Sequence, residues 1–325
     1  MKCKVLIIGF GKIGKIKASI WKKYGCDVSV YDINHNRVNA ARLEGYKCVL
    51  NLQTDLDFSY IDICTPTLFH IYYLRELLLN SQAQLLVEKP LVSNIRDFTL
   101  LKECIEESSE NAERIIFSEQ YYYSKALAYL KNLIENENLI SVQIVMNKNR
   151  ISDNQKGRFI DNELEAFGIE IPHMLAILDF FKVDWKQFKP EKEISLYLSN
   201  DAINSGCRVL GRVAEVEINL ESFLGSYRYN QSGVIFKNSQ IERYLIIKTD
   251  KTEYRVVFDP VKAFPRYFTV VEYNGVKRIF DDNLLENMII SILSNMKKEK
   301  LSVHNGLEIS KKLIELRSQA AMKEF

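Results

Sequence analysis

The first thirty-two residues constrain the fold of this chain more than any other stretch. Residues 4–8 form a short apolar run of strand-forming side chains, and the sequence GFGKIG follows directly at 9–14. A helical stretch over 15–24 comes next, followed by a second apolar strand over 27–31 that ends on Asp32. This order of strand, glycine-rich turn, helix, strand and acid predicts a βαβ unit that binds a dinucleotide.

Each glycine of this turn has a physical role in that interpretation. Gly9 lets the chain turn tightly out of the strand, and Gly11 lets a pyrophosphate approach the backbone. Gly14 lets the helix pack closely against the sheet. The start of the helix then offers N–H groups and the positive end of its dipole to the phosphates.

Asp32 indicates which dinucleotide binds. A carboxylate at the end of the second strand can accept hydrogen bonds from a ribose diol, whereas a 2′-phosphate would meet a like charge. The sequence therefore predicts NAD as the cofactor. Arg37 lies close to Asp32 in the sequence, which leaves NADP open.

The composition is that of a globular protein with two domains. The chain has 325 residues, of which 47% are hydrophobic and 26% are charged, and its net charge of +2 provides no basic surface for nucleic acid. Six scattered cysteines without a CxxC pair indicate reduced thiols rather than disulfides or a metal site. No signal peptide and no membrane-spanning apolar run are visible, so we expect a cytoplasmic protein without membrane contacts.

Short apolar strands alternate with helices as far as about residue 120, which predicts an α/β domain with a doubly wound parallel sheet. Beyond it, strand candidates alternate apolar and polar residues, most clearly VEINL at 216–220. This alternation is typical of an antiparallel sheet with one exposed face. We therefore predict a Rossmann domain over 1–122 and an α+β domain over 123–325, whose last helix can pack back on the first domain.

The second domain is expected to contain several strands and one largely helical segment. The strands expected there cover 140–146, 194–198, 215–220, 244–248, 254–258, 268–273 and 276–280, and the largely helical segment covers 166–181.

Three further stretches follow predicted strands of the first domain. They are CTPTLFH at 64–70, EKP at 88–90 and SEQY at 118–121. Ligands of open parallel sheets bind outside the carboxyl ends of the strands. We therefore expect all three stretches near the nicotinamide end of the cofactor.

These motifs resemble those of the Gfo/Idh/MocA oxidoreductases. The resemblance rests on GFGKIG, on DICTPTLFH and above all on VEKP, and it extends to SEQYYYSKAL and to the closing NGLEISKKLIELRSQA. It implies a Rossmann domain followed by a domain with an open-faced, mainly antiparallel sheet, through which a homodimer or homotetramer would form. It also implies NAD(P)-dependent oxidation of a hydroxyl, or reduction of a ketone, on a sugar, amino sugar or cyclitol.

The resemblance implies catalytic roles for Lys89 and His173. Lys89 matches the family's EKP lysine, which contacts the substrate hydroxyl and the cofactor, and an ammonium group there stabilises developing alkoxide character. A surface lysine before a proline is the alternative, and the 89–90 bond can be cis. His173 matches the histidine that donates or accepts the proton, a role that suits imidazole because it exchanges protons near neutral pH.

The stretch before His173 departs from the family pattern. The family usually has an aspartate four residues before the histidine, where this chain has Ile169, and the nearest acid is Glu170. In one interpretation Glu170 replaces that aspartate in a substrate-binding or acid–base pair with His173. In the other, His173 is a packed histidine on an apolar helix. The missing aspartate indicates a substrate unlike that of most relatives.

The predicted site residues fall into three sets. The cofactor-binding set is Gly9, Phe10, Gly11, Lys12, Ile13, Gly14, Asp32, Thr65, Pro66, His70, Glu88 and Lys89. The substrate-binding set is Gln120, Tyr121, Glu170 and His173, and the catalytic set is Lys89, His173 and Glu170. Glu88 is expected to bond a cofactor ribose. Residues 147–150 are expected to form a solvated loop, the alternative being that they reach a substrate phosphate or carboxylate. No metal site is expected.

Three functional hypotheses follow from the sequence. The first is the sugar, amino sugar or cyclitol oxidoreductase described above. The second is an enzyme of the same fold that keeps NAD bound and uses transient oxidation to cleave or rearrange a glycosidic bond. The third is a non-catalytic protein that senses NAD or a sugar.

Overall fold

The chain folds into two compact units. The computed structural model describes residues 3–52, 56–157, 159, 161–190, 194–199, 201–229, 234–262, 264–294 and 301–324. The first unit comprises Met1–Glu119 and Met288–Lys311, and the second comprises Gln120–Asn287 and Lys312–Phe325. The chain therefore crosses between the two units three times, the last two crossings lying in its final helices.

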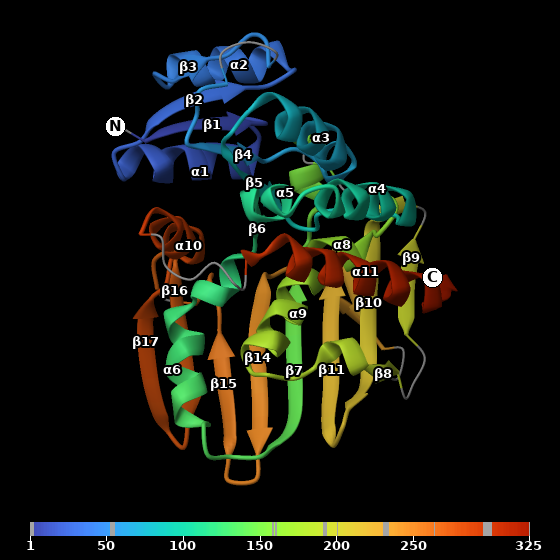
Figure 1. Ribbon diagram of the computed structural model, residues 1–325. Coiled ribbons are helices and arrows are strands. Elements are labelled where there is room, and N and C mark those ends of the chain that lie inside the picture. The colour runs from blue at the N-terminus through green and yellow to red at the C-terminus, as the bar shows by residue number, and fades with distance from the viewer. Residues whose placement is uncertain are drawn as a thin grey trace. The chain divides into compact units, whose positions relative to one another are not determined.

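The first unit is built on a six-stranded sheet with the order β3-β2-β1-β4-β5-β6 (Figure 1). The strands are β1 (Lys4–Ile8), β2 (Asp27–Tyr31), β3 (Lys47–Cys48), β4 (Tyr60–Ile63), β5 (Gln84–Glu88) and β6 (Ile115–Ser118). Every neighbouring pair is parallel. The strand order reverses between β1 and β4, as in a doubly wound fold, which confirms the predicted Rossmann topology.

Helices follow the strands of this sheet and pack on it. They are α1 (Lys12–Lys23), α2 (His35–Leu43), α3 (His70–Asn80), α4 (Ile95–Glu106) and α5 (Ser109–Arg114), with a 3-10 turn η1 (Thr67–Phe69) before α3. Asn34, Asn94 and Ser108 cap α2, α4 and α5, because each side chain accepts a hydrogen bond from a backbone N–H of the first turn. On α1, Ala18, Ile20 and Trp21 are among the buried residues.

The second unit is built on a mixed ten-stranded sheet. Its main order is β17-β16-β15-β14-β7-β11-β10-β9-β18, with β8 paired to β10. The strands are β7 (Leu139–Asn147), β8 (Lys189–Pro190), β9 (Ser195–Ser199), β10 (Asp201–Val213), β11 (Val216–Phe223), β14 (Glu242–Thr249), β15 (Glu253–Val257), β16 (Phe268–Tyr273), β17 (Val276–Asp281) and β18 (Ala321–Glu324). Only β7–β11 and β9–β18 are parallel among its pairs, so the prediction of a mainly antiparallel sheet is confirmed.

Helices cover one face of this sheet, as Figure 1 shows for α6 (Lys125–Leu133) and α9 (Ile171–Phe180). The helix α6 packs on β16 and β17, and α9 packs on β11. The opposite face is wetter, since on β15 Glu253 and Arg255 are exposed while Tyr254 and Val256 are buried. The remaining elements of the unit are η2 (Gln120–Tyr123), α7 (Ile151–Gln155), α8 (Ala166–Ile169), η3 (Trp185–Gln187), β12 (Tyr227–Tyr229) and β13 (Ile235–Lys237). The helices α10 (Leu284–Leu293) and α11 (Val303–Gln319) each contribute residues to both units.

The segment expected to be largely helical over 166–181 contains the helices α8 and α9, because the chain leaves the helix at Ile169 and restarts at Ile171, with Pro172 in its first turn. Proline has no N–H to donate and is favoured at a helix start rather than inside one. The strand β10 was not expected at all, since its first half is polar and it contains Gly206. That glycine is required, because a Cβ there would lie 2.1 Å from the ring of Phe223.

Arg114 holds the end of α3 through side-chain hydrogen bonds to four backbone carbonyls. It donates to the carbonyl oxygens of Leu77, Leu78, Ser81 and Ala83, at 3.3, 3.2, 2.5 and 3.3 Å. The last carbonyls of a helix have no partner within the helix. Arg114 therefore supplies hydrogen-bond donors to backbone carbonyl oxygens at and just after the end of α3.

Replacing Arg114 by methionine should lower the free energy of unfolding by about 3 kcal/mol, because buried carbonyls would lose a charged donor. Urea denaturation followed by circular dichroism measures the change. Arg42→Met is the matched control, since the exposed side chain of Arg42 donates to the exposed side chain of Asn39 at 3.4 Å. Equal effects of the two substitutions would contradict this role.

Candidate active site

The glycine turn after β1 has the geometry that a close-packed phosphate site needs. Gly9 adopts a φ of 94°, and its N–H donates to the carbonyl oxygen of Tyr31 at 2.8 Å. A Cβ on Gly14 would lie 1.9 Å from the carbonyl oxygen of Gly9, so only glycine allows α1 to pack this closely. At Gly11 the nearest atom to an added Cβ is Nη1 of Arg37, at 3.9 Å. The backbone at Gly11 is therefore open to a ligand.

The helix α1 begins at Lys12, directly after this turn, and Ile13 lies in its first turn. The first N–H groups of a helix have no partner within the helix, and its dipole favours an anion there. An open backbone at Gly11 next to such a helix start suits a pyrophosphate. The predicted phosphate-binding residues thus lie together in one turn.

Asp32 lies beside the same turn and is already hydrogen-bonded to it. Its Oδ2 accepts from the N–H of Phe10 at 2.7 Å, and its Oδ1 accepts from the N–H of Asn34 at 2.8 Å. The guanidinium of Arg37 lies 3.6 Å from Oδ2. A carboxylate has about four acceptor positions, so Asp32 keeps capacity for a ribose hydroxyl.

The turns after β4 and β5 are tied together by His70. This buried ring places Nδ1 at 3.1 Å from the carbonyl oxygen of Pro90 and 3.2 Å from that of Leu91. Its Nε2 lies 3.0 Å from the carbonyl oxygen of Thr65. Burial lowers the pKa of His70, which favours the neutral ring. His70 therefore holds two turns in place.

Lys89 and Thr65 lie in these two turns. The Lys89–Pro90 peptide is cis, as the sequence allowed. The backbone N–H of Cys64 donates to the carbonyl oxygen of Ile8 at 2.8 Å, which places the turn after β4 beside the glycine turn. Oγ1 of Thr65 is buried and has no hydrogen-bond partner among the described residues. Such an orphaned polar atom fits a site that a polar cofactor completes.

A buried ionic cluster beneath these turns was not predicted. The ammonium group of Lys17, which is fully buried on α1, donates to Asp62 at 2.6 Å, to Glu88 at 2.8 Å and to Ser118 at 3.1 Å. Nε1 of Trp21 donates to the other oxygen of Asp62 at 3.0 Å, and Ser118 donates to Glu88 at 3.0 Å. Glu88, expected to bond a ribose, thus has one oxygen engaged with Lys17 and Ser118.

The surroundings of Lys17 and Glu88 favour the charged form of both side chains. Burial alone would lower the pKa of Lys17, but the carboxylates of Asp62 and Glu88 raise it above its ordinary value. Burial alone would raise the pKa of Glu88, but Lys17 lowers it below its ordinary value. Burial raises the pKa of the Cys64 thiol well above its usual range, so Cys64 remains neutral. The available signal in the sequence was Lys17 on a buried helix face and Asp62 inside an apolar strand.

In the second unit, His173 lies on the first turn of α9 and is 7% exposed. Its ring centroid is 4.9 Å from that of Tyr121, which in turn is 5.2 Å from that of Phe258. Tyr121 and Gln120 belong to η2, which packs against α9. The structure thus brings together two of the predicted substrate-binding residues, Tyr121 and His173, in direct ring contact.

Glu170 precedes α9 and is almost completely buried, with 1% exposed. Arg150 and Arg243 both donate to its Oε1, Arg243 at 2.9 Å. The charge of Glu170 raises the pKa of Arg243. The expectation of a solvated loop over 147–150 was wrong for two residues, since Asn147 is fully buried and Arg150 is 3% exposed. No local pattern in the sequence indicates that Arg243, far along the chain, shares this carboxylate.

Two features are absent from the described residues. They contain no group of three His, Cys, Asp or Glu side chains that could hold a metal ion. No helix in the described part of the chain is long and apolar enough to cross a membrane.

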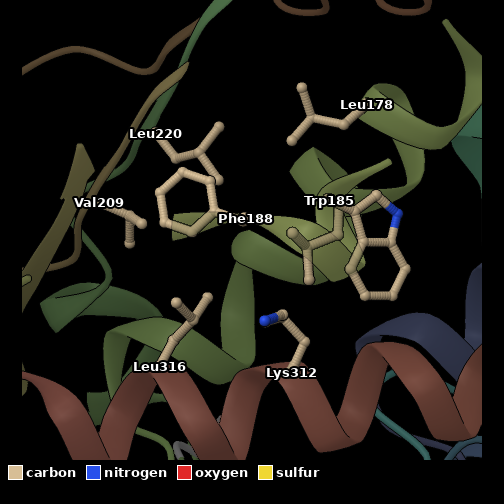
Figure 2. Close-up of a pocket in the computed structure, with 8 residues that line it drawn as sticks. Leu178, Trp185, Phe188, Val209, Leu220, Lys312 and Leu316 are labelled. Atoms are coloured by element: carbon tan, nitrogen blue, oxygen red, sulfur yellow. The ribbon is translucent and has the colours of Figure 1, made fainter. Parts of the chain in front are cut away.

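A small apolar cavity in the second unit is not a substrate site (Figure 2). Its volume of about 10 Å³ is near the minimum for one water molecule. It is lined by Leu175, Leu178, Trp185, Phe188, Val209, Leu220, Lys312 and Leu316. Side chains from α9, the sheet and α11 leave this gap between them, so it is a packing defect.

Comparisons with known proteins agree with this geometry. Residues 3–113 match the model of the Gfo/Idh/MocA family, described as an oxidoreductase family with an NAD-binding Rossmann fold. No curated protein matches the sequence. The first unit thus resembles the NAD-binding Rossmann domain of an oxidoreductase family. The family whose model these residues match is the one that the sequence motifs resemble.

Solved structures share the fold over nearly the whole chain. KijD10, a 3-ketoreductase from Actinomadura kijaniata, has a TM-score of 0.75 at 12% identity and covers 100% of both chains. UDP-N-acetylglucosamine 3-dehydrogenase from Acidithiobacillus ferrooxidans has a TM-score of 0.72 at 12% identity and covers 98% of both chains. A myo-inositol dehydrogenase from Corynebacterium glutamicum has a TM-score of 0.67 at 15% identity and covers 98% of this chain and 95% of its own.

Asp32→Asn should weaken NADH binding about tenfold, because a neutral amide is a poorer partner for the ribose hydroxyls. Binding of NADPH should be affected less, since the repulsive charge is lost. Fluorescence titration of bound NADH and NADPH measures both affinities. Asp27→Asn, at the opposite end of β2, is the control and should leave both unchanged. A preference of the unaltered protein for NADPH would contradict the role of Asp32.

Proposed function

We propose that this protein transfers hydride between a nicotinamide cofactor and a carbon that carries a hydroxyl or keto group, on a sugar, amino sugar or cyclitol. The observation that supports this proposal most is that the glycine turn and the turn bearing Lys89 lie at one edge of the sheet in the first unit. The strands β1, β4 and β5 are parallel neighbours in register, with Ile8 opposite Ile63 and Ile63 opposite Val87. The glycine turn and the turn bearing Lys89 therefore follow strands that end at the same sheet edge.

The similar solved structures support the substrate class. One acts on UDP-N-acetylglucosamine, one is a 3-ketoreductase in complex with a TDP compound and NADP, and one is a myo-inositol dehydrogenase. The shared chemistry is oxidation or reduction at a ring carbon that carries oxygen. We propose the same chemistry for this chain.

In the proposed reaction Lys89 stabilises charge on the reacting oxygen. As an ammonium group it can donate a hydrogen bond to that oxygen while alkoxide character develops. Bound NAD(P) would supply the hydride acceptor or donor. His173 takes the hydroxyl proton during oxidation and returns a proton to the same oxygen during reduction, so that one hydride and one proton move in either direction.

Glu170 has a positioning role in this proposal. Its carboxylate accepts hydrogen bonds from two arginines, which favours the ionised form, so it is poorly suited to exchange protons itself. Because the N–H of Met174 donates to the carbonyl oxygen of Glu170, the residue also belongs to the backbone of the first turn of α9. Glu170 would therefore fix the start of the helix that bears His173.

Lys89→Ala and His173→Ala should each lower kcat/KM by about 10² to 10⁴, which is the usual range for losing a general acid–base or a charge-stabilising group. The measurement is an NADH- or NADPH-linked assay against a panel of sugars, keto-sugars and inososes. Lys47→Ala, which removes an exposed lysine on β3 of the same unit, is the control. Full activity of either active-site variant would overturn the role assigned to that residue.

We also propose that the protein assembles as a homodimer or homotetramer through its second unit. Apolar side chains are exposed there on β13 and β17, including Ile235 at 60% and Ile279 at 50%. Contact with a second copy would bury them. Light scattering coupled to size-exclusion chromatography should give a mass of two or four chains, and Ile279→Glu or Ile235→Glu should reduce it. A single-chain mass at micromolar concentration would exclude this assembly.

A further inference from the structure

Asp32 is fixed in place beside the glycine turn. Its side chain is only 3% exposed, and its two oxygens accept hydrogen bonds from the backbone N–H groups of Phe10 and Asn34, at 2.7 and 2.8 Å. A carboxylate held through both oxygens cannot turn away from a ligand that approaches it. A dinucleotide with a 2′-phosphate would therefore meet this negative charge, unless a cation lies beside it.

Arg37 is such a cation, and the start of α2 holds it there. Nη1 of its guanidinium lies 3.6 Å from Oδ2 of Asp32. The same Nη1 would lie 3.9 Å from a Cβ on Gly11, in the turn that suits a pyrophosphate. The backbone N–H of Arg37 donates to the backbone and side-chain oxygens of Asn34, at 3.0 and 3.4 Å. The guanidinium is therefore close to both the selecting acid and the phosphate turn.

The contact between Arg37 and Asp32 leaves the guanidinium able to bind an anion. A separation of 3.6 Å is too long for a hydrogen bond, so the pair is held by charge alone. The side chain of Arg37 is 42% exposed. A guanidinium has five N–H donors in a planar fork, whose geometry matches that of phosphate oxygens. Arg37 can thus offset the charge of Asp32 and donate to a phosphate at the same time.

We propose that Arg37 is a second determinant of cofactor choice, which binds the 2′-phosphate of NADP(H) and lets the protein use both dinucleotides. Asp32 accepts hydrogen bonds from the ribose hydroxyls of NAD(H), and Arg37 offsets its charge when a 2′-phosphate binds. Every residue in the first turn of α2 is described, and none is an acid that would oppose this anion. The inference rests on the proposed function, because it concerns the cofactor of that reaction, but cofactor binding can be measured without a sugar.

Arg37→Gln tests the inference, with isothermal titration calorimetry of NADH and NADPH as the measurement. Loss of a charged donor to the phosphate should weaken NADPH binding about tenfold to a hundredfold. NADH has no 2′-phosphate, so its affinity should change by less than about fivefold, which is what an exposed ion pair contributes. Glutamine is a good helix former, so α2 should persist.

Arg37→Lys and Arg42→Gln are the matched controls. Lysine keeps the positive charge, so the first variant should retain most of the NADPH affinity. Arg42→Gln removes an exposed arginine from the last turn of the same helix and should leave both affinities unchanged.

Two nucleotide fragments supply a second readout, since adenosine 2′,5′-bisphosphate and adenosine 5′-monophosphate differ only in the 2′-phosphate. Arg37→Gln should weaken binding of the bisphosphate by the same factor as binding of NADPH. The affinity for the monophosphate should change no more than that for NADH. Circular dichroism verifies that the variants fold.

Equal weakening of NADH and NADPH binding in folded Arg37→Gln overturns the inference, because Arg37 would then contact a part that both cofactors share. Binding of NADH but not of NADPH by the unaltered protein overturns it as well. Selective loss of NADPH binding, without turnover of any sugar in either cofactor-linked assay, overturns the proposed function and leaves the inference standing.

Discussion

The parallel register of β1, β4 and β5 is the constraint on which the candidate site depends. Hydrogen bonding between parallel neighbours forces all three strands to end at one edge, so the turns that follow them must meet there. The helix α1 packs closely against the sheet at the same edge, and this packing places Gly14 against the carbonyl oxygen of Gly9. Cofactor contacts and the Lys89 turn are therefore consequences of strand pairing.

Buried charge is used in both units, but in different arrangements. In the first unit, one lysine joins two carboxylates from different strands. In the second unit, one carboxylate joins two arginines, from the segment after β7 and from β14. Such clusters contribute little net stability compared with a well-packed apolar core, although breaking them is strongly destabilising. These clusters contribute to the geometry of the site, since each one fixes the backbone beside a residue with a proposed chemical role, Lys89 after Glu88 and His173 after Glu170.

Local patterns in the sequence predicted the parts of the site that depend on local geometry. The glycine turn, Asp32 and the cis Lys89–Pro90 turn could be read because each requires particular residues at fixed spacing. The clusters around Glu88 and Glu170 could not, because they join residues from strands and helices far apart in the chain. The strand β10 was missed for a related reason. Its polar half has no strand-forming pattern of its own and becomes a strand through pairing with β9 and β11.

His70 has a mechanical consequence that follows from its three carbonyl contacts. One rigid ring spans the turn that ends β4 and the turn that contains the cis proline, so neither turn can shift without straining the other. The two segments behave as a single body, and the conformational entropy of aligning them is lost when the chain folds and not when a ligand binds. A ligand that reaches this edge therefore finds its contacts already assembled, and flexibility needed for its entry or release has to come from elsewhere in the molecule.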